Sequence, residues 1–414
     1  MKKHILVIAQ YFYPEQFRIN DICTQWVKRG YRVTVITGIP NYPQGKYYKG
    51  YGLFSRRMEM YNGIKVIRIP LIPRGKSSIM LALNYLSFVV SGLFWNIFTK
   101  VKADYVFIFE VSPMTQALPG VWYAKKRKIP CYLYVQDLWP QNVEIITGIT
   151  NKHIIGAIGK MVDYIYANCS KIFTTSNSFV SSIESRGVPI ENIEYWPQYA
   201  EDFYKPLNKM CGYNNSEHKI TIKEIPNDKR FNIIFAGNIG LAQGLDILPK
   251  ASSFIKQKNL NREIRFNIVG DGRYKEMLIK IVNDSGLADM FNFIEKQPAT
   301  RIPEFMAASD AAFLCLSGGP LFSMTIPAKL QSYMACGIPI LASASGETDK
   351  IIKQSNSGLC SPAGDPSKLS DIIVELSNQS SQRLSELGTN ARNYYDDNFN
   401  KEELLNRMDK YFLV

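Results

Sequence analysis

Short apolar segments alternate with longer segments of helical periodicity along most of the chain. The short segments are bounded by glycine, proline or polar residues, which is typical of buried strands, and the longer ones predict helices between them. Strand–helix alternation of this kind predicts an α/β protein with parallel sheets. The strands are expected at residues 4–9, 30–37, 64–69, 104–110, 129–135, 172–176, 231–236, 266–270, 291–294, 311–316 and 338–342.

The clearest single pattern is the segment Pro327–Ala342. Pro327 suits the first turn of a helix, where its missing N–H costs nothing. Leu330, Tyr333 and Met334 have the spacing of one helical face, and Gly337 is expected to end the helix. Residues 338–342 then return to an apolar strand. The segment therefore predicts a helix with an open N-terminus, followed at once by a buried strand.

Two loops have the composition of phosphate-binding loops. Residues 316–326, before the helix just described, carry two glycines and three hydroxyl side chains, and Lys329 adds a positive charge in the first turn. Residues 237–246 follow a strand, contain three glycines and lead into a helix. The alternatives are a packed helix with a solvent-facing lysine and a simple strand–helix turn.

Acidic side chains stand at the ends of two predicted strands, where ligands bind in open α/β sheets. Asp137 follows strand 129–135 and is a candidate general base. Its alternative role is to cap the next helix. Glu110 ends its own strand and is a second candidate. Arg18, at the start of a helix, is expected to meet a phosphate or to form a surface salt bridge.

Charge is distributed unevenly. The chain of 414 residues carries a net charge of +13, and residues 1–200 hold 24 Lys and Arg against 11 Asp and Glu, which accounts for all of it. Such asymmetry indicates an anionic partner for the first half. No nucleic-acid-binding motif accompanies the charge, so a membrane surface or a lipid pyrophosphate is the better expectation. Seven scattered cysteines and three isolated histidines favour neither a disulfide framework nor a zinc site.

The segment 79–98 is apolar over the length of a membrane-spanning helix. Asn84, Ser87, Ser91, Gly92 and Asn96 interrupt it. We expect a long core helix, with lipid on one face as an alternative, and membrane spanning as the less favoured reading. The apolar run after Met1 is too short for a secretory signal peptide.

The segment 327–342 resembles the signature region of retaining glycosyltransferase family 4. Strand 30–37, the loop 237–246, Val269-Gly-Asp-Gly272 and residues 357–366 also resemble family segments, in the same order. The resemblance implies the GT-B fold, an α/β architecture of two Rossmann-like parallel-sheet domains facing across a cleft. It also implies an N-terminal domain of residues 1–196, joined by a C-terminal helix at about 395–414, and a nucleotide-sugar-binding domain of residues 197–394. A proline- and aromatic-rich segment, 193–206, marks the boundary, and 208–229 is expected to be an irregular loop.

The chain departs from the family at its best-known positions. The two family glutamates are replaced by Met324 and Ser332, and the glycine-loop Arg and Lys by Asn238 and Gln243. The resemblance still implies three groups of site residues. Catalytic candidates are Asp137, Glu110 and Lys329. Donor nucleotide and diphosphate candidates are Gly237, Asn238, Gly240, Gln243, Gly270, Asp271, Gly272, Gln297, Thr325, Ile326, Pro327, Lys329, Gln331 and Ser332. Acceptor-side candidates are Phe17 and Arg18.

The resemblance implies a retaining glycosyltransferase that uses a UDP-sugar, with an N-acetylhexosamine or 6-deoxy-hexosamine as the sugar. The acceptor is expected to be a lipid-pyrophosphate-linked saccharide of O-antigen or capsule synthesis, as in fucosamine transferases. Neither a metal nor a cofactor is expected, since no Asp-x-Asp motif occurs. The protein is expected in the cytoplasm, peripheral on the inner face of the membrane. A UDP-sugar epimerase of the same fold and a non-catalytic sugar- or membrane-binding subunit remain alternatives.

Overall fold

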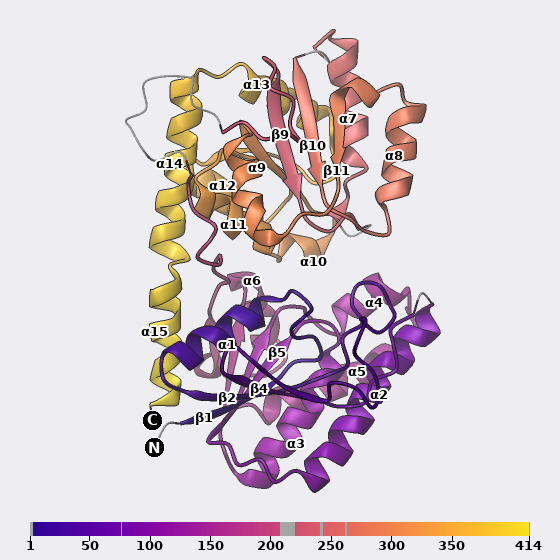
Figure 1. Ribbon diagram of the computed structural model, residues 1–414, viewed down its shortest axis with the longest axis vertical. Coiled ribbons are helices and arrows are strands. Elements are labelled where there is room, and N and C mark those ends of the chain that lie inside the picture. Colours follow the sequence, from indigo (N-terminus) through magenta and orange to yellow (C-terminus); the bar gives the residue numbers. More distant parts are fainter. Residues whose placement is uncertain (1–2, 76, 208–219, 241–242, 261–262, 414) are drawn as a thin grey trace. The chain divides into compact units, whose positions relative to one another are not determined.

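The computed structural model describes residues 3–75, 77–207, 220–240, 243–260 and 263–413 (Figure 1). It contains two compact units, Met1–Trp196 with Met408–Val414, and Pro197–Arg407. The C-terminal segment was expected to rejoin the first unit from about residue 395. Residues 395–407 instead stay with the second unit, because the Ala200 amide donates to the Tyr395 hydroxyl (3.1 Å) and Lys401 pairs with Asp202 (2.8 Å). The predicted irregular segment 208–229 lies partly, at 208–219, outside the described residues.

The first unit is built on an eight-stranded sheet of order β3-β4-β2-β1-β5-β6-β7-β8. Its pairs are parallel except for the β3–β4 hairpin at one edge. The central strands are buried along their whole length, as parallel strands covered on both faces must be. The strands are β1 (His4–Ile8), β2 (Arg32–Thr37), β3 (Met58–Tyr61), β4 (Ile64–Arg68), β5 (Tyr105–Glu110), β6 (Cys131–Val135), β7 (Lys171–Thr174) and β8 (Ile193–Tyr195).

Helices connect these strands, and the C-terminal end of the chain completes the core of this unit. The Phe412 side chain is fully buried, with ring centroids 5.3 Å from Trp26 and 5.8 Å from Tyr132. The helices are α1 (Arg18–Lys28), α2 (Ser78–Phe98), α3 (Ala117–Arg127), α4 (Gln141–Thr147), α5 (Lys152–Ala167) and α6 (Asn177–Glu184), with 3-10 turns at Met114–Gln116 and Ile190–Asn192. Helix α15 (Lys401–Phe412) begins in the second unit and ends in the first.

The second unit is built on a six-stranded sheet of order β11-β10-β9-β12-β13-β14, with every pair parallel. The chain adds strands outward from β9 in one direction and then from β12 in the other. The point between β9 and β12 is therefore the switch point at which ligands bind in such sheets. The strands are β9 (Phe231–Ala236), β10 (Ile264–Val269), β11 (Phe291–Ile294), β12 (Ala311–Cys315), β13 (Ile340–Ser343) and β14 (Gly358–Ser361).

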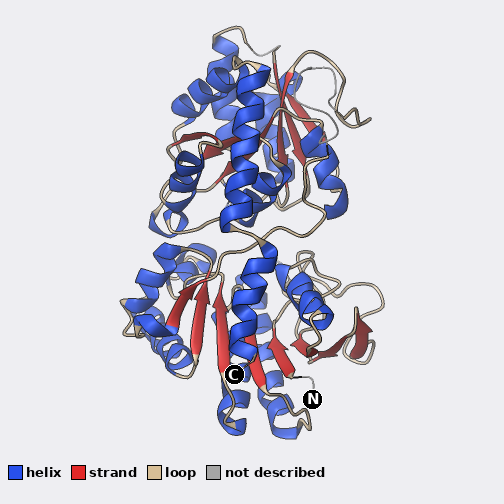
Figure 2. Cartoon of the chain, turned by 90° about the vertical axis from the view of Figure 1, so that its left-hand side faces the viewer, coloured by secondary structure: helices blue, strands red, loops and turns tan. Residues whose placement is uncertain are grey.

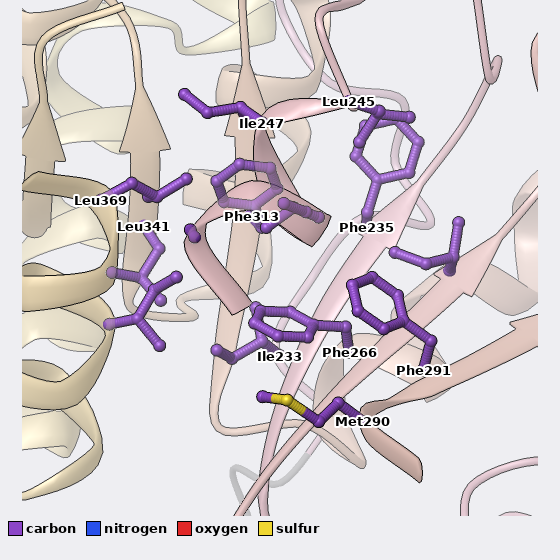
Figure 3. Packing of buried hydrophobic residues seen from close by; sticks show 14 of the residues in the cluster. Ile233, Phe235, Leu245, Ile247, Phe266, Met290, Phe291, Phe313, Leu341 and Leu369 are labelled. Carbon is purple, nitrogen blue, oxygen red and sulfur yellow. The ribbon is translucent and has the colours of Figure 1, made fainter. Parts of the chain in front are cut away.

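The core of the second unit lies between this sheet and its helices. Figure 3 shows Phe235, Phe266, Phe313 and Leu341, from four strands, in one buried cluster. Figure 2 distinguishes the strands from the helices that flank them. The helices are α7 (Ile247–Gln257), α8 (Lys275–Asp284), α9 (Ile302–Ala307), α10 (Pro320–Ser323), α11 (Ala328–Cys336), α12 (Glu347–Ser355), α13 (Pro366–Ser377) and α14 (Ser381–Asn398), with 3-10 turns at Ala288–Met290 and Ala299–Arg301.

The predicted helix–strand segment forms α11 and β13. Pro327 is the N-cap residue, and the helix begins one residue later, at Ala328. Gly337 ends it in the left-handed conformation, with φ +67°. The preceding segment was predicted to be a loop throughout, but Pro320 begins the short helix α10 there. The α/β prediction of two parallel-sheet units is confirmed.

Candidate functional site

The loops after β9 and β10 pack closely against each other in the second unit. Gly237 follows β9, and Gly270 follows β10, with positive φ values of +139° and +150°. An ideal Cβ on Gly270 would lie 2.0 Å from the Gly237 carbonyl oxygen, so a side chain there would force the backbones apart. The Ile239 amide also donates to the Asp271 carbonyl (2.9 Å). The two glycine loops are thus one surface at the carboxyl ends of neighbouring strands.

Lys329 reaches this surface from the first turn of α11. Its Nζ lies 3.2 Å from Gln243 Oε1 and 3.8 Å from the centroid of the Phe235 ring. An ideal Cβ on Gly237 would lie 2.6 Å from Lys329 Cε, so the lysine stem lies directly against the glycine. The structure therefore brings together three residues predicted for one site, namely Lys329, Gly237 and Gln243.

The ammonium of Lys329 is partly withdrawn from water. Burial lowers the pKa of Lys329 to about 8, because the charged form loses hydration. A diphosphate beside it would stabilise the charged form and raise that pKa again. The lysine is therefore still mostly protonated at neutral pH, in a place where it gains more from an anion than an exposed lysine would.

The start of α11 supplies a second anion-binding element. Pro327 provides no side-chain cap, and although the Leu330 amide donates to the Pro327 carbonyl (2.9 Å), the amides of Ala328 and Lys329 are left to be satisfied from outside the helix. Ser332 lies three residues after Lys329 and shares its face of the helix, whereas Gln331 lies on another face. The Gln331 side chain is only 1% exposed, and its Oε1 has no hydrogen-bond partner among the described residues. Ser332 is also buried, at 7% exposed, and its hydroxyl donates to the Ala328 carbonyl (3.3 Å), so its place on the Lys329 face is what distinguishes it from Gln331.

The other predicted donor residues are more dispersed. Asn238 is exposed beside Gly240. Gln297 follows β11, and its Oε1 accepts from Arg301 (2.7 Å). It therefore does not join the cluster around Lys329. The Thr325 hydroxyl donates to the Leu321 carbonyl (3.0 Å), which commits it to its own loop. Among the remaining candidates, Ile326 is buried, and Asp271 is exposed and accepts from the Gly272 amide (2.8 Å).

In the first unit, the two predicted carboxylates lie together at the ends of the adjacent strands β5 and β6. The Asp137 amide donates to Glu110 Oε2 at 3.4 Å. Asp137 Oδ2 accepts from the Ser112 amide at 2.7 Å, while the Trp139 indole and Asn142 both donate to the Ser112 hydroxyl. The helix after this loop is capped by Pro140, so the alternative that Asp137 caps it is wrong.

Their environments separate the two carboxyl groups. Burial, and then the nearby charge of Asp137, raise the pKa of Glu110 well above its usual value, and its Oε1 has no hydrogen-bond partner among the described residues. Burial also raises the pKa of Asp137, but Ser112 and Asn142 oppose the rise. Two backbone amides, of Asp137 and Gln136, also oppose the rise at Glu110, whereas Asp137 is opposed by side-chain as well as backbone hydrogen bonds, which favours the charge on Asp137. Because Glu110 is fully buried, the expectation that it contacts substrate is corrected: it can act only by positioning Asp137.

The acceptor-side candidates Phe17 and Arg18 lie at the start of α1. Phe17 stacks on Tyr11 with a centroid distance of 5.3 Å and contacts Tyr42 at 5.4 Å. Arg18 is partly exposed, and its charge opposes the rise that burial causes in the pKa of Tyr134, on β6. These residues form an aromatic and basic surface at the same edge of the sheet as Asp137.

Sequence reasoning missed residues that support the two sites. Glu15 is buried, and its Oε1 accepts from the amides of Asn41 (2.8 Å) and Tyr42 (2.6 Å). It thereby fixes the loop 40–51 to the loop after β1. Phe235, beneath Lys329, was read only as part of an apolar strand. A carboxylate in a loop after a strand was the signal for Glu15, whereas no sequence signal identified Phe235.

No metal-binding cluster of His, Cys, Asp or Glu occurs among the described residues. A hollow lined by Lys229, Arg230, Phe231 and Glu263 lies at the amino end of β9, opposite to Gly237. It is therefore separate from the Lys329 surface.

Comparison with known proteins agrees with this division. Residues 216–394, all within the second unit, match the family described as "Glycosyl transferases group 1". The colanic acid biosynthesis glycosyl transferase WcaI of Escherichia coli is 25% identical over 355 residues, covering 83% of this chain and 84% of the relative. A D-inositol 3-phosphate glycosyltransferase of Pseudarthrobacter chlorophenolicus is 29% identical over 131 residues, covering 31% of this chain and 30% of the relative.

Solved structures are similar over almost the whole chain. Sucrose-phosphate synthase from Thermosynechococcus elongatus has a TM-score of 0.76 at 15% identity, covering 99% of this chain and 98% of the other. HepE from Anabaena, in complex with UDP, has a TM-score of 0.69 at 14% identity, covering 99% of each chain. The fold is therefore GT-B, as the sequence predicts. The family match and the relatives support a glycosyltransferase of group 1.

Proposed function

We propose that this protein transfers a sugar from a UDP-sugar, with retention and without a metal, to a lipid-pyrophosphate-linked saccharide in surface polysaccharide synthesis. The observation that carries the donor half of the proposal is Lys329, half-buried against Phe235 and Gly237 at the switch point of the second sheet. The N-acetylhexosamine or 6-deoxy-hexosamine and the UDP carrier follow from the family resemblance. The relatives WcaI and WcaL, named for colanic acid biosynthesis, support the polysaccharide context.

The leaving diphosphate would be stabilised electrostatically. Lys329 carries the positive charge, and the amides at the start of α11 add hydrogen-bond donors aimed at the same surface. Gln243, which accepts from Lys329, would keep the lysine oriented before the donor binds. Ser332 would contact the ribose. Because the family Arg and Lys of the glycine loop are absent, Lys329 would carry a larger share of diphosphate binding here.

The acceptor half of the proposal rests on Asp137. Its ionised carboxylate would orient the acceptor hydroxyl and take its proton, while the neutral Glu110 beneath it keeps the pair from carrying two charges. Phe17 and Arg18 would contact the acceptor. We further propose that the basic first unit binds the inner face of the cytoplasmic membrane, where a lipid-linked acceptor is found.

Calorimetry in the presence of a chelator tests the donor half. We expect UDP to bind the wild-type protein, and Lys329→Ala to weaken that binding at least tenfold, about 1.4 kcal/mol. Lys250→Ala, which removes an exposed lysine from α7, is the matched control and should bind UDP as the wild type does. GDP and inorganic phosphate are measured in parallel.

Each other outcome has a distinct meaning. Folded protein that binds no nucleotide would contradict the transferase proposal and favour a non-catalytic subunit, consistent with the replaced family residues at Asn238, Gln243 and Met324. Preference for GDP would keep the site and change the donor. Equal losses of UDP affinity in Lys329→Ala and Lys250→Ala would contradict the position assigned to the diphosphate.

A further inference from the structure

Helix α2 turns a mixed polar and aromatic face inward. Its buried residues are Asn84, Tyr85, Phe88, Gly92 and Asn96, whereas its exposed side chains are mostly apolar. Asn84 Nδ2 donates to the Ile72 carbonyl (2.6 Å), and its Oδ1 accepts from Gln10 (2.8 Å). The prediction of a core helix is therefore only half right: one face, with Asn84 and Phe88, is held in the core, and the other is exposed. Its outer face is the reverse of an ordinary surface helix.

The outward side chains form one continuous stripe. The apolar stripe comprises Ile79, Leu83, Leu86, Val90, Phe94 and Ile97, with exposed fractions from 40% (Leu83) to 74% (Ile79). The spacing of three and four residues keeps all six on one face. Of the most apolar part of this helix only 17% is buried, and among the described residues α2 alone is long and apolar enough to cross a membrane. A stripe of this size on a monomer marks an interaction surface.

Basic residues flank both ends of the stripe. At the C-terminal end, Lys126 Nζ donates to the Asn96 carbonyl (3.0 Å) and Arg127 to the Thr99 carbonyl (3.4 Å), from the last turn of α3. At the other end, the loop that carries the exposed Lys46 and Lys49 is joined to the segment before α2, where the Gly75 amide donates to the Gly45 carbonyl (3.0 Å).

The sequence carries this charge almost without compensation. Residues 41–128 hold 14 Lys and Arg against three Asp and Glu, a net charge of +11, and no acidic residue occurs from 60 to 103. Two copies of the chain joined through the stripe would bring basic ends together. An anionic lipid surface instead satisfies both the apolar stripe and its basic flanks.

We infer that α2 lies in the interface of an anionic bilayer, with its apolar stripe among the acyl chains and its flanking lysines and arginines at the headgroups. The axis runs along the membrane plane, because the opposite face is held by the core: an ideal Cβ on Gly92 would lie 2.3 Å from Pro119 Cγ. This rests on the proposed function and deepens it, since it names the surface that brings the first unit to a lipid-linked acceptor.

Vesicle flotation with full-length protein tests the inference. The wild type should float with vesicles of phosphatidylcholine and phosphatidylglycerol, and less with phosphatidylcholine alone or with added salt. Leu86→Gln with Phe94→Gln should reduce flotation at least tenfold. The matched control is Phe254→Gln with Met277→Gln, which removes exposed apolar side chains from α7 and α8 and should float as the wild type does. Lys46→Gln with Lys49→Gln, which removes two exposed flanking lysines, should lose the preference for phosphatidylglycerol.

A second readout locates the contact. Phe94→Trp should be quenched by brominated lipid, whereas Met277→Trp should add no quenching.

The inference is overturned if the Leu86/Phe94 variant floats normally, or if Phe94→Trp is not quenched. It is also overturned if the stripe proves to join two copies, seen as a dimer lost in that variant without vesicle binding. Resistance to alkaline extraction would indicate a spanning helix instead. UDP calorimetry on the same variants tests whether the donor site is affected. A variant that binds UDP as the wild type does but no longer floats has lost membrane binding alone, so the two proposals can fail separately.

Discussion

The two units share a parallel-sheet architecture but differ in charge and in how they would recognise a ligand. The first unit, with residues 408–414, holds 25 Lys and Arg against 12 Asp and Glu, and the second holds 24 of each. In the second, the candidate site consists of glycine loops, a helix start and one lysine. In the first, it consists of two buried carboxyl groups, an aromatic surface and an apolar helix.

The difference follows from the ligands that the two units are proposed to bind. A diphosphate can be held by backbone amides, which any sequence supplies once its glycines and helix starts are in position. An acceptor and a membrane need particular side chains, such as Asp137 or the stripe on α2. The family match covers residues 216–394, in the second unit, which is where backbone geometry dominates. Specificity of the first unit therefore has to be read from its own residues.

The largest expected effect is the loss of sugar transfer in Asp137→Asn, which would assign the catalytic base to the first unit. This substitution should lower transfer of labelled sugar from a UDP-N-acetylhexosamine into extractable lipid by about 100-fold to 10,000-fold, the range for a lost general base. UDP affinity should not change, because Asp137 belongs to the other unit. Glu144→Gln, in the exposed part of α4, is the control. Normal transfer activity in the Asp137→Asn variant would contradict the assignment of the base.

A second experiment concerns the fold of the first unit alone. Burial raises the pKa of Glu15 to about 7, although the Tyr42 and Asn41 amides oppose the rise. Because the unfolded chain ionises near its ordinary pKa of 4.5, the contribution of Glu15 to stability is present at low pH and lost between pH 4.5 and 7. Relative to wild type, Glu15→Gln should therefore gain stability by up to about 3 kcal/mol as pH rises from 4 to 8.

Tryptophan fluorescence during denaturant unfolding measures this effect. All five tryptophans, Trp26, Trp95, Trp122, Trp139 and Trp196, belong to the first unit, so the signal reports that unit. The amide-accepting oxygen is kept in the glutamine variant, which isolates the charge. Glu144→Gln, which removes a carboxylate from the exposed part of α4, is the control. A constant difference between Glu15→Gln and wild type across pH would contradict the raised pKa.

The smallest effect distinguishes two neighbouring residues of α11. Ser332→Ala should weaken UDP binding by about threefold to tenfold, the size of one neutral hydrogen bond, because Ser332 shares a helical face with Lys329. Gln331→Ala should leave UDP affinity unchanged and alter only the melting temperature, because its side chain lies on another face of the helix from Lys329. Calorimetry and thermal unfolding of both variants check this. The reverse pattern would move the ribose to the other side of the helix.

Periodicity and turn residues predicted most of the fold. Pro327 and Gly337 bound α11 to within one residue, since proline and glycine act through local backbone geometry. The β3–β4 hairpin was missed, although Asn62 and Gly63, with φ values of 47° and 79°, carry its turn signal. That strand is short and half exposed, so its apolar pattern is weak.

Side-chain environment was harder to predict than backbone. The sequence indicated Lys329 and Asp137, because charged residues at helix starts and strand ends have a local signature. It did not indicate that Glu110 is fully buried or that α2 turns its asparagines inward. Those properties depend on which residues from distant segments, such as Gln10 and Ile72, lie opposite in the fold.

The burial of Phe412 also bears on the order in which the protein is made. Its ring lies in the first unit against Trp26 and Tyr132, yet it is synthesised after the whole of the second unit. A ribosome that has completed residues 1–196 has released a sheet whose core lacks this ring, and it must add roughly 200 more residues before supplying it, at about 5–20 residues per second. The nascent first unit therefore spends tens of seconds incomplete, and its maturation depends on the last turn of α15.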